Sequence, residues 1–86
     1  MKQFAYTITD ALGIHARPAG LLAKEARAFA DTGITVAKDG HAARASQRMK
    51  LMSLGVKQGD TVTVMAEGAS EDAAIAAMEA FFKAKL

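Results

Sequence analysis

The hydrophobic positions in the first third of the chain follow two different periods. Near the start, Phe4, Tyr6 and Ile8 alternate with small or polar residues, a pattern typical of a half-buried β-strand. From Ala16 to about Phe29 the apolar positions instead recur every three or four residues, which predicts an amphipathic helix. The expected buried stripe of this helix consists of Ala19, Leu22, Ala23, Ala26 and Phe29.

The middle of the chain predicts two strands joined by a hairpin. Residues 31–33 are expected to close the helix, with Gly33 as a left-handed cap. Residues 34–37 alternate again and predict a strand, and the Asp-Gly pair at 39–40 favours a tight turn. A short third strand is therefore expected from His41 to about Arg44.

The second half of the chain predicts a short helix, a strand and a longer helix. The short apolar helix is expected at about 47–54, and the strict alternation over 62–66 predicts the strongest strand. Ser70 suits the N-cap of the last helix, followed by two acidic residues where the helix dipole favours them. The buried face of this helix is expected to carry Ile75, Met78 and Phe82.

The order of these elements, βαββαβα, predicts an α+β fold. Four mostly antiparallel strands are expected to form one sheet with helices covering one of its faces. The length of 86 residues suits a single domain spanning 1–86. Because so small a domain buries only a modest core, its chemistry is expected at the surface.

Composition narrows the classes of function. Cysteine is absent, so the chain has no disulfide framework and no thiol nucleophile. With only two histidines and no cysteine, we expect no structural zinc site, and no motif calls for a cofactor. The formal net charge of +2 is small for a nucleic-acid-binding protein and suits a modest basic patch that contacts an acidic protein partner.

The apolar segments are short. The first residues lack the apolar run of a signal peptide, and no segment approaches the roughly 18 apolar residues that a membrane span needs. We therefore expect a cytoplasmic protein that does not insert into a membrane.

The segment around His15 combines several features of an anion site. Pro18 is tolerated only in the first turn of a helix, which places the helix start at His15 or Ala16. The imidazole is then expected at a ring of free backbone N–H groups, where the helix dipole favours an anion. A phosphoryl group on His15 would lie in that field, and Arg17 could add a charge-assisted hydrogen bond to its oxygens.

The exposed face of the same helix also carries an apolar residue. If Leu22 and Ala26 point inward, then Arg17, Gly20, Leu21 and Lys24 point outward. Leu21, framed by two basic residues, suits the anchor of a partner surface. An alternative is that His15 only caps the helix and that Arg17 is a solvated charge, and the residues alone leave the two interpretations about equal.

The run Gly-Ile-His-Ala-Arg-Pro-Ala over 13–19 resembles the active-site signature of HPr, the histidine-containing phosphocarrier family of the bacterial sugar phosphotransferase system. The similarity extends to the order of the elements, the segment 49–55, Gly68 and the chain length. The resemblance implies an open-faced β-sandwich, with a four-stranded antiparallel sheet and three helices on one face.

The resemblance also implies a function. His15 would be phosphorylated on Nδ1 by phospho-enzyme I and would pass the group to the A component of a sugar-specific enzyme II. Arg17 and the amides of Ala16 and Arg17 would hold the phosphoryl group. The protein would be a monomeric carrier with a transient phosphohistidine and not a turnover enzyme. The implied docking residues are Gly20, Leu21, Lys24, Arg48, Met49 and Met52, with Arg48 standing where the family has an apolar residue.

Many members of this family carry a regulatory serine at the start of the second helix, and here its position has two solutions. Counting 31 residues on from His15 reaches Ser46, whereas counting eight back from Gly55 reaches Gln47. Phosphorylation of Ser46 would imply a serine kinase or a transcriptional regulator as a partner. The simpler interpretation is that Ser46 caps the short helix.

Two other functions share these residues. A regulatory binding module would use the same face to hold a partner without phosphate throughput. A relay serving nitrogen-related or other regulation would share the chemistry. His41, the other histidine, is expected to be a solvated strand residue.

Overall fold

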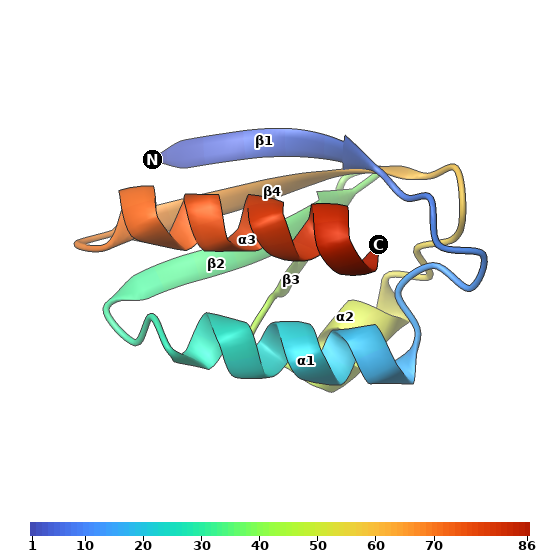
Figure 1. The fold of residues 1–86 in the computed structure, drawn as a ribbon, viewed down its shortest axis with the longest axis horizontal. Coiled ribbons are helices and arrows are strands. Elements are labelled where there is room, and N and C mark those ends of the chain that lie inside the picture. Colours follow the sequence, from blue (N-terminus) through green and yellow to red (C-terminus); the bar gives the residue numbers. More distant parts are fainter.

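The computed structural model describes residues 1–86 and contains the seven elements in the predicted order (Figure 1). The strands are β1 (Lys2–Thr7), β2 (Thr32–Lys38), β3 (His41–Arg44) and β4 (Thr61–Gly68). The helices are α1 (Ala16–Arg27), α2 (Arg48–Ser53) and α3 (Glu71–Lys85). The strands pair in the order β1-β4-β2-β3 and every pair is antiparallel. The predicted α+β class, an open four-stranded sheet with three helices, is confirmed.

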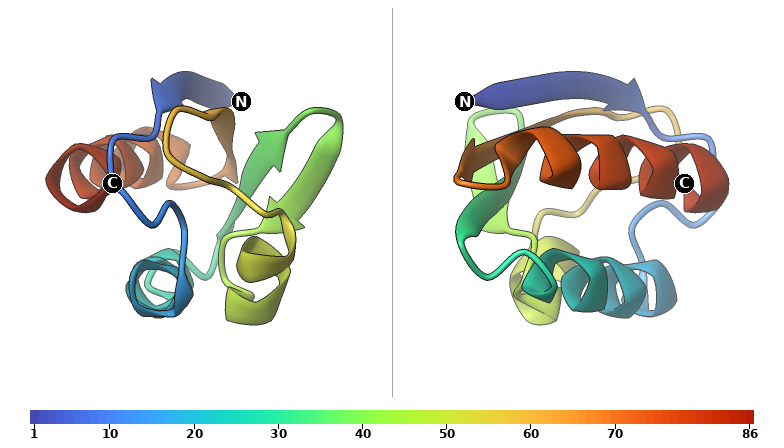
Figure 2. Two further views of the ribbon diagram at one scale, coloured as in Figure 1. Left: turned by 90° about the vertical axis from the view of Figure 1, so that its right-hand side faces the viewer. Right: turned by 60° about the vertical axis from the view of Figure 1, so that its left-hand side comes forward.

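The core lies between the sheet and the helices. Along β4, the side chains of Val62, Val64 and Ala66 are fully buried, whereas the alternate residues are exposed or partly exposed on the other face. Helix α3 runs beside β1 and β4, and α1 and α2 lie next to each other (Figure 2). One buried cluster of 19 residues joins the three helices to β2, β3 and β4, and Phe4 and Tyr6 of β1 pack against it. The alternation of the strands therefore decides which face of the sheet is covered.

Phe82 attaches α3 to the edge strand of the sheet. Its ring makes edge-to-face contacts with Phe4 and Tyr6 of β1, with centroids 5.8 and 5.6 Å apart. Phe81 packs against the same ring at 6.2 Å. Aromatic pairs in this arrangement stabilise a core beyond the area that they bury.

The predicted end of the first helix is wrong. Helix α1 ends at Arg27, and its C-cap is Ala28 in a right-handed helical conformation. Gly33 is not a left-handed cap, because it lies within β2 and pairs with Glu67 of β4. Hydrogen bonding to β4 makes Gly33 part of a regular strand. The helix ends before it, at the short turn that follows Ala28.

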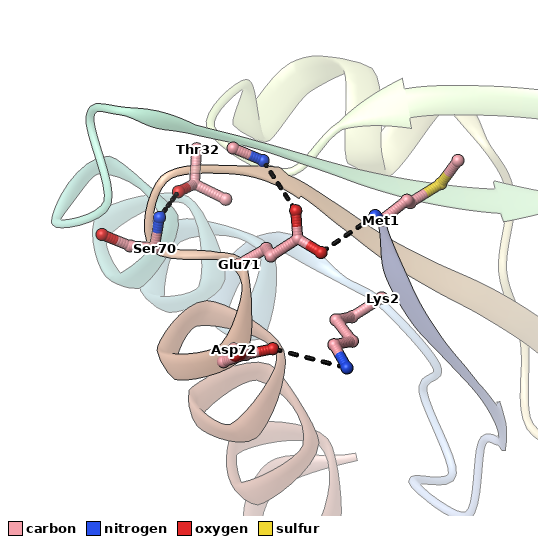
Figure 3. A network of polar contacts seen from close by, with 7 residues as sticks. Met1, Lys2, Thr32, Ser70, Glu71 and Asp72 are labelled. Carbon is pink, nitrogen blue, oxygen red and sulfur yellow. Dashed lines mark hydrogen bonds and ion pairs between the residues drawn. The ribbon is translucent and has the colours of Figure 1, made fainter.

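The N-cap of α3 is Ser70, as predicted, but its hydroxyl does not cap the helix. It donates instead to the Asp31 carboxylate at 3.0 Å. The Ser70 amide donates to the Thr32 hydroxyl at 2.9 Å, a bond shown in Figure 3. The side chain therefore ties the start of α3 to the start of β2, two points far apart in the sequence.

Glu71 extends this polar network to β1 (Figure 3). It accepts a hydrogen bond from the Gly68 amide and forms an ion pair with the amino group of Met1 at 2.9 Å. The bond from this amino group lowers the pKa of Glu71. A second pair joins Lys2 and Asp72 at 3.6 Å. This network holds the start of α3 at the end of the molecule remote from the start of α1 (Figure 1).

The loop between α2 and β4 is held by one lysine at the end of β2. The Lys38 ammonium contacts the Asp60 carboxylate at 2.8 Å and donates to the Gly55 carbonyl at 2.9 Å. The Asp60 carboxylate also accepts the Lys57 amide at 2.8 Å. The hydrogen bond from Lys38 is the main cause that lowers the pKa of Asp60, followed by the bond from Lys57.

We expect Asp60→Asn to lower the free energy of unfolding at pH 7. Because the pKa of Asp60 is lower in the folded than in the unfolded protein, its contribution is present above the ordinary value of 3.8 and is lost as the pH falls through the folded value. The difference between wild type and variant, measured by urea unfolding, should therefore shrink on acidification. Asp39→Asn, an exposed acid without an ion pair, is the control. A difference that stays constant with pH would contradict this assignment.

Candidate functional site

Helix α1 begins as the proline predicts. His15 is the N-cap, with an extended backbone at φ −95° and ψ −173°, and its carbonyl accepts the Ala19 amide at 3.0 Å. Pro18 is buried in the first turn. The N–H groups of this turn have no acceptor within the helix, so the missing N–H of proline costs no hydrogen bond there. The amides of Ala16 and Arg17 donate to no protein acceptor, as is usual at a helix start.

The imidazole of His15 makes no capping hydrogen bond to these amides. His15 is thus the N-cap by the position of its backbone, and its side chain does not cap the helix. Its Nε2 atom instead lies 3.9 Å from Oδ1 of Asp10, and the His15 side chain is 36% exposed. The ring is turned toward the loop before the helix and remains accessible to another protein.

His15 lies in a shallow depression with basic side chains. The lining residues are Asp10, His15, Arg17, Pro18, Leu21 and Lys85. Two of the three charged residues beside His15 are cations, Arg17 from α1 and Lys85 from the end of α3, so the depression suits an anion. The sequence reasoning missed Lys85, since nothing local connects residues 70 positions apart. It also missed Asp10, which lies in the loop between β1 and α1.

The loop that carries His15 rests directly on the loop between α2 and β4. Gly13 has φ +66°, and a Cβ at this position would clash with the carbonyl of Val56 and approach Lys57 Cα to 2.7 Å. The same carbonyl accepts the Ile14 amide at 3.1 Å. Only glycine combines this left-handed backbone with so close an approach. The position of His15 therefore depends on a backbone contact two residues before it.

The residues implied as docking residues lie together across α1 and α2, and we call Gly20, Leu21, Lys24, Arg48, Met49 and Met52 the docking surface. Leu21 and Met49 are 43% and 66% exposed, whereas Met52 is partly buried against the core. The Arg48 side chain lies over Gly20, since a Cβ there would be 3.4 Å from Arg48 Cδ. This surface adjoins the depression through Leu21, which lines both.

The expectation that Ser46 caps the second helix is wrong. The N-cap of α2 is Gln47, whose carbonyl accepts the Leu51 amide at 3.1 Å, and no side chain caps the helix. The turn after β3 closes with a bond from the Gln47 amide to the Arg44 carbonyl, so the helical ladder starts one residue after Ser46. This placement agrees with the count of eight back from Gly55. Ser46 itself is partly buried.

His41 lies at the exposed start of β3, opposite Lys38. It is not part of the depression around His15.

The three helices are too short or too polar for any of them to span a membrane.

Comparison with known proteins identifies the family. A family model described as "PTS HPr component phosphorylation site" matches residues 2–84. The phosphocarrier protein HPr of Mycoplasma genitalium is 44% identical over 80 residues, covering 93% of this chain and 91% of the relative. The crystal structure of HPr-C-His from Thermoanaerobacter tengcongensis, 40% identical, superimposes with a TM-score of 0.92 over 99% of this chain and 94% of that one.

A second structure from the same organism, described as an HPr dimer, has the same 40% identity and a TM-score of 0.77, covering 99% of this chain and 97% of that one.

The chain belongs to the HPr family, the phosphocarrier proteins of the phosphotransferase system. Such a protein carries a phosphoryl group from one protein to another.

We expect Gly13→Ala to lower the free energy of unfolding by about 2–4 kcal/mol. About 1–2 kcal/mol reflects the left-handed backbone and the rest the clash with Val56. Gly40→Ala is the matched control, because it has φ +81° but nothing within 4 Å of the added Cβ. Urea unfolding of both variants separates the two effects. Equal losses would show that the contact with Val56 contributes nothing.

Proposed function

We propose that this chain accepts a phosphoryl group on Nδ1 of His15 from phospho-enzyme I and passes it to the A component of a sugar-specific enzyme II. The observation that carries the proposal is the placement of His15 at the N-cap of α1, accessible and without a capping bond. An imidazole that is free of internal partners on its helix side can act as a nucleophile toward a group brought by another protein.

The surroundings of His15 support a negatively charged phosphoryl group. The free amides of Ala16 and Arg17 and the helix dipole favour an anion at this position. The guanidinium of Arg17 can donate two parallel hydrogen bonds to phosphoryl oxygens. Lys85 adds a second positive charge at the same depression.

A relay also requires that the phosphoryl group can leave. The site is open to water, which weakens each of these electrostatic contacts relative to a buried site. The group is thus held less tightly than in a pocket enclosed by several cations. Modest stabilisation keeps the free energies of the donor, carrier and acceptor close enough for transfer onward.

The docking surface supports protein partners with an acidic face. Leu21 and Met49 offer apolar anchors, and exposed basic residues surround them. Arg48 lies among these anchors, over Gly20, where the family has an apolar residue. A partner carboxylate opposite Arg48 would avoid leaving that charge unpaired at the interface.

Three further points complete the proposal. We expect a monomer, although a crystallised relative is described as a dimer. A relay that draws on phosphoenolpyruvate is expected in the cytoplasm. Phosphorylation of Ser46 stays a prediction from the resemblance, and its position before the N-cap of α2 adds no support to it.

His15→Ala is expected to abolish phosphorylation. After incubation with phosphoenolpyruvate and enzyme I, wild type should carry one acid-labile phosphate per chain, because only His15 has the surroundings described. His41→Ala, the matched control, should be labelled like wild type. Intact-mass spectrometry under mildly alkaline conditions measures the label. A His15→Ala chain that still acquires an acid-labile phosphate would refute the proposal.

Leu21→Ala is expected to weaken the encounter with enzyme I rather than the chemical step. The loss of a central apolar anchor costs about 1–2 kcal/mol at a protein interface. We therefore expect the KM for phosphorylation to rise about five- to thirtyfold with little change in kcat. Met65→Ala, on the uncovered face of the sheet, is the control. An unchanged KM for Leu21→Ala would remove this residue from the docking surface.

A further inference from the structure

We infer that Asp10 is a positioning residue that selects the tautomer of His15, keeping the proton on Nε2 so that Nδ1 is the nucleophilic nitrogen. The inference rests on the proposed function, in which Nδ1 receives the phosphoryl group. It assigns a role to a side chain that neither the signature over 13–19 nor the docking surface includes.

Asp10 is held in place through its backbone and its side chain. Its Oδ1 atom accepts the Leu12 amide at 2.8 Å, and its carbonyl accepts the Gly13 amide at 3.0 Å. Its own amide donates to the carbonyl oxygen of Leu86 at 2.8 Å. These bonds fix the carboxylate on the side of the loop that faces His15.

The same Oδ1 atom lies 3.9 Å from Nε2 of His15. This distance exceeds that of a hydrogen bond, but a small rotation of the His15 ring closes it. Contacts of catalytic groups are often long in the free protein and shorten when the partner binds. Asp10 is the one acidic residue that lines the depression, and the other charged side chains there, Arg17 and Lys85, are cations. Among these charged side chains, Asp10 is therefore the one that can attract an N–H of the ring.

This attraction decides which ring nitrogen has the free electron pair. A neutral imidazole carries one proton, and the tautomer is set by the hydrogen bond that one nitrogen makes. A carboxylate beside Nε2 favours the proton there and leaves the lone pair on Nδ1. An aspartate that orients a catalytic histidine in a Ser-His-Asp triad acts on the same principle.

The transfer step then needs no proton movement. The Nδ1 lone pair attacks the phosphorus of the phosphorylated partner, the N–P bond forms, and the bond from phosphorus to the donor breaks with its electron pair. Nε2 keeps its proton, so the ring gains a positive charge that the Asp10 carboxylate stabilises. When the group passes on, the electron pair of the N–P bond returns to Nδ1 and the ring is neutral again.

Asp10 also acts against the other nitrogen. A phosphoryl group on Nε2 would place its negative oxygens next to the Asp10 carboxylate, and like charges at this range repel. One residue thus favours attack by Nδ1 and disfavours modification of Nε2.

Asp10→Asn tests this role with little disturbance of the loop. The Asn side-chain oxygen can still accept the Leu12 amide, so the turn is kept while the charge is removed. Glu67→Gln, an exposed carboxylate on the uncovered face of the sheet, removes the same charge elsewhere. In ¹⁵N-histidine NMR spectra of the unphosphorylated proteins at alkaline pH, we expect the fraction of His15 with its proton on Nε2 to fall in Asp10→Asn only. The phosphorylation rate with limiting enzyme I should fall about three- to tenfold, as for the loss of one charge-assisted contact.

An unchanged tautomer ratio in Asp10→Asn would overturn the inference, and so would a slower rate without a change in that ratio. The NMR measurement needs no phosphoryl donor. If wild type takes no phosphate on His15, the proposed function fails, whereas a shifted tautomer ratio in Asp10→Asn would still support the role of Asp10.

Discussion

The contact between Gly13 and the carbonyl of Val56 is the constraint on which the site depends. At this contact the loop before α1 packs directly against the loop before β4, and the hydrogen bond from the Ile14 amide to the Val56 carbonyl joins the two loops. Lys38 and Asp60 fasten the second loop to the sheet, so His15 is positioned by the sheet through two backbone segments. Pro18 then makes the chain turn into a helix directly after His15. The backbone that carries an exposed reactive side chain is in this way anchored to the sheet.

The same arrangement explains how a domain with so small a core can carry a phosphoryl group. In the proposed relay the anion is stabilised by groups that cost no buried volume, namely the first amides of α1 and two basic side chains at the rim of a shallow depression. The docking surface begins at the same rim, because Leu21 lines the depression and also lies among the apolar anchors. A partner that binds the docking surface therefore lies next to the His15 imidazole.

Much of this fold could be predicted from the sequence, because the period of the apolar residues changes with each element. The strand at 62–66, the hairpin at 39–40 and the start of α1 just before Pro18 are all predicted by local signals, and each prediction is correct. The end of α1 was not, since Gly33 has the composition of a cap but is drawn into a strand by pairing with β4. Neither Ser70 nor Ser46 is a capping side chain. The hydroxyl of Ser70 binds Asp31, a contact between residues far apart in the sequence, whereas Ser46 lies one residue before Gln47, where the α2 ladder starts.

The site shows the same division. The positions of His15 at the helix start and of Arg17 and Leu21 on its exposed face could be predicted from a proline and a helical period, whereas Asp10 and Lys85 come to His15 only through the fold. The central claim is that His15 carries the phosphoryl group on Nδ1. Its most direct test is a combined ³¹P and ¹⁵N NMR spectrum of the wild-type protein after incubation with phosphoenolpyruvate and enzyme I. The account predicts a single phosphoryl group bonded to Nδ1 of His15, and a phosphoryl group on Nε2, on His41 or on Ser46 in its place would contradict it.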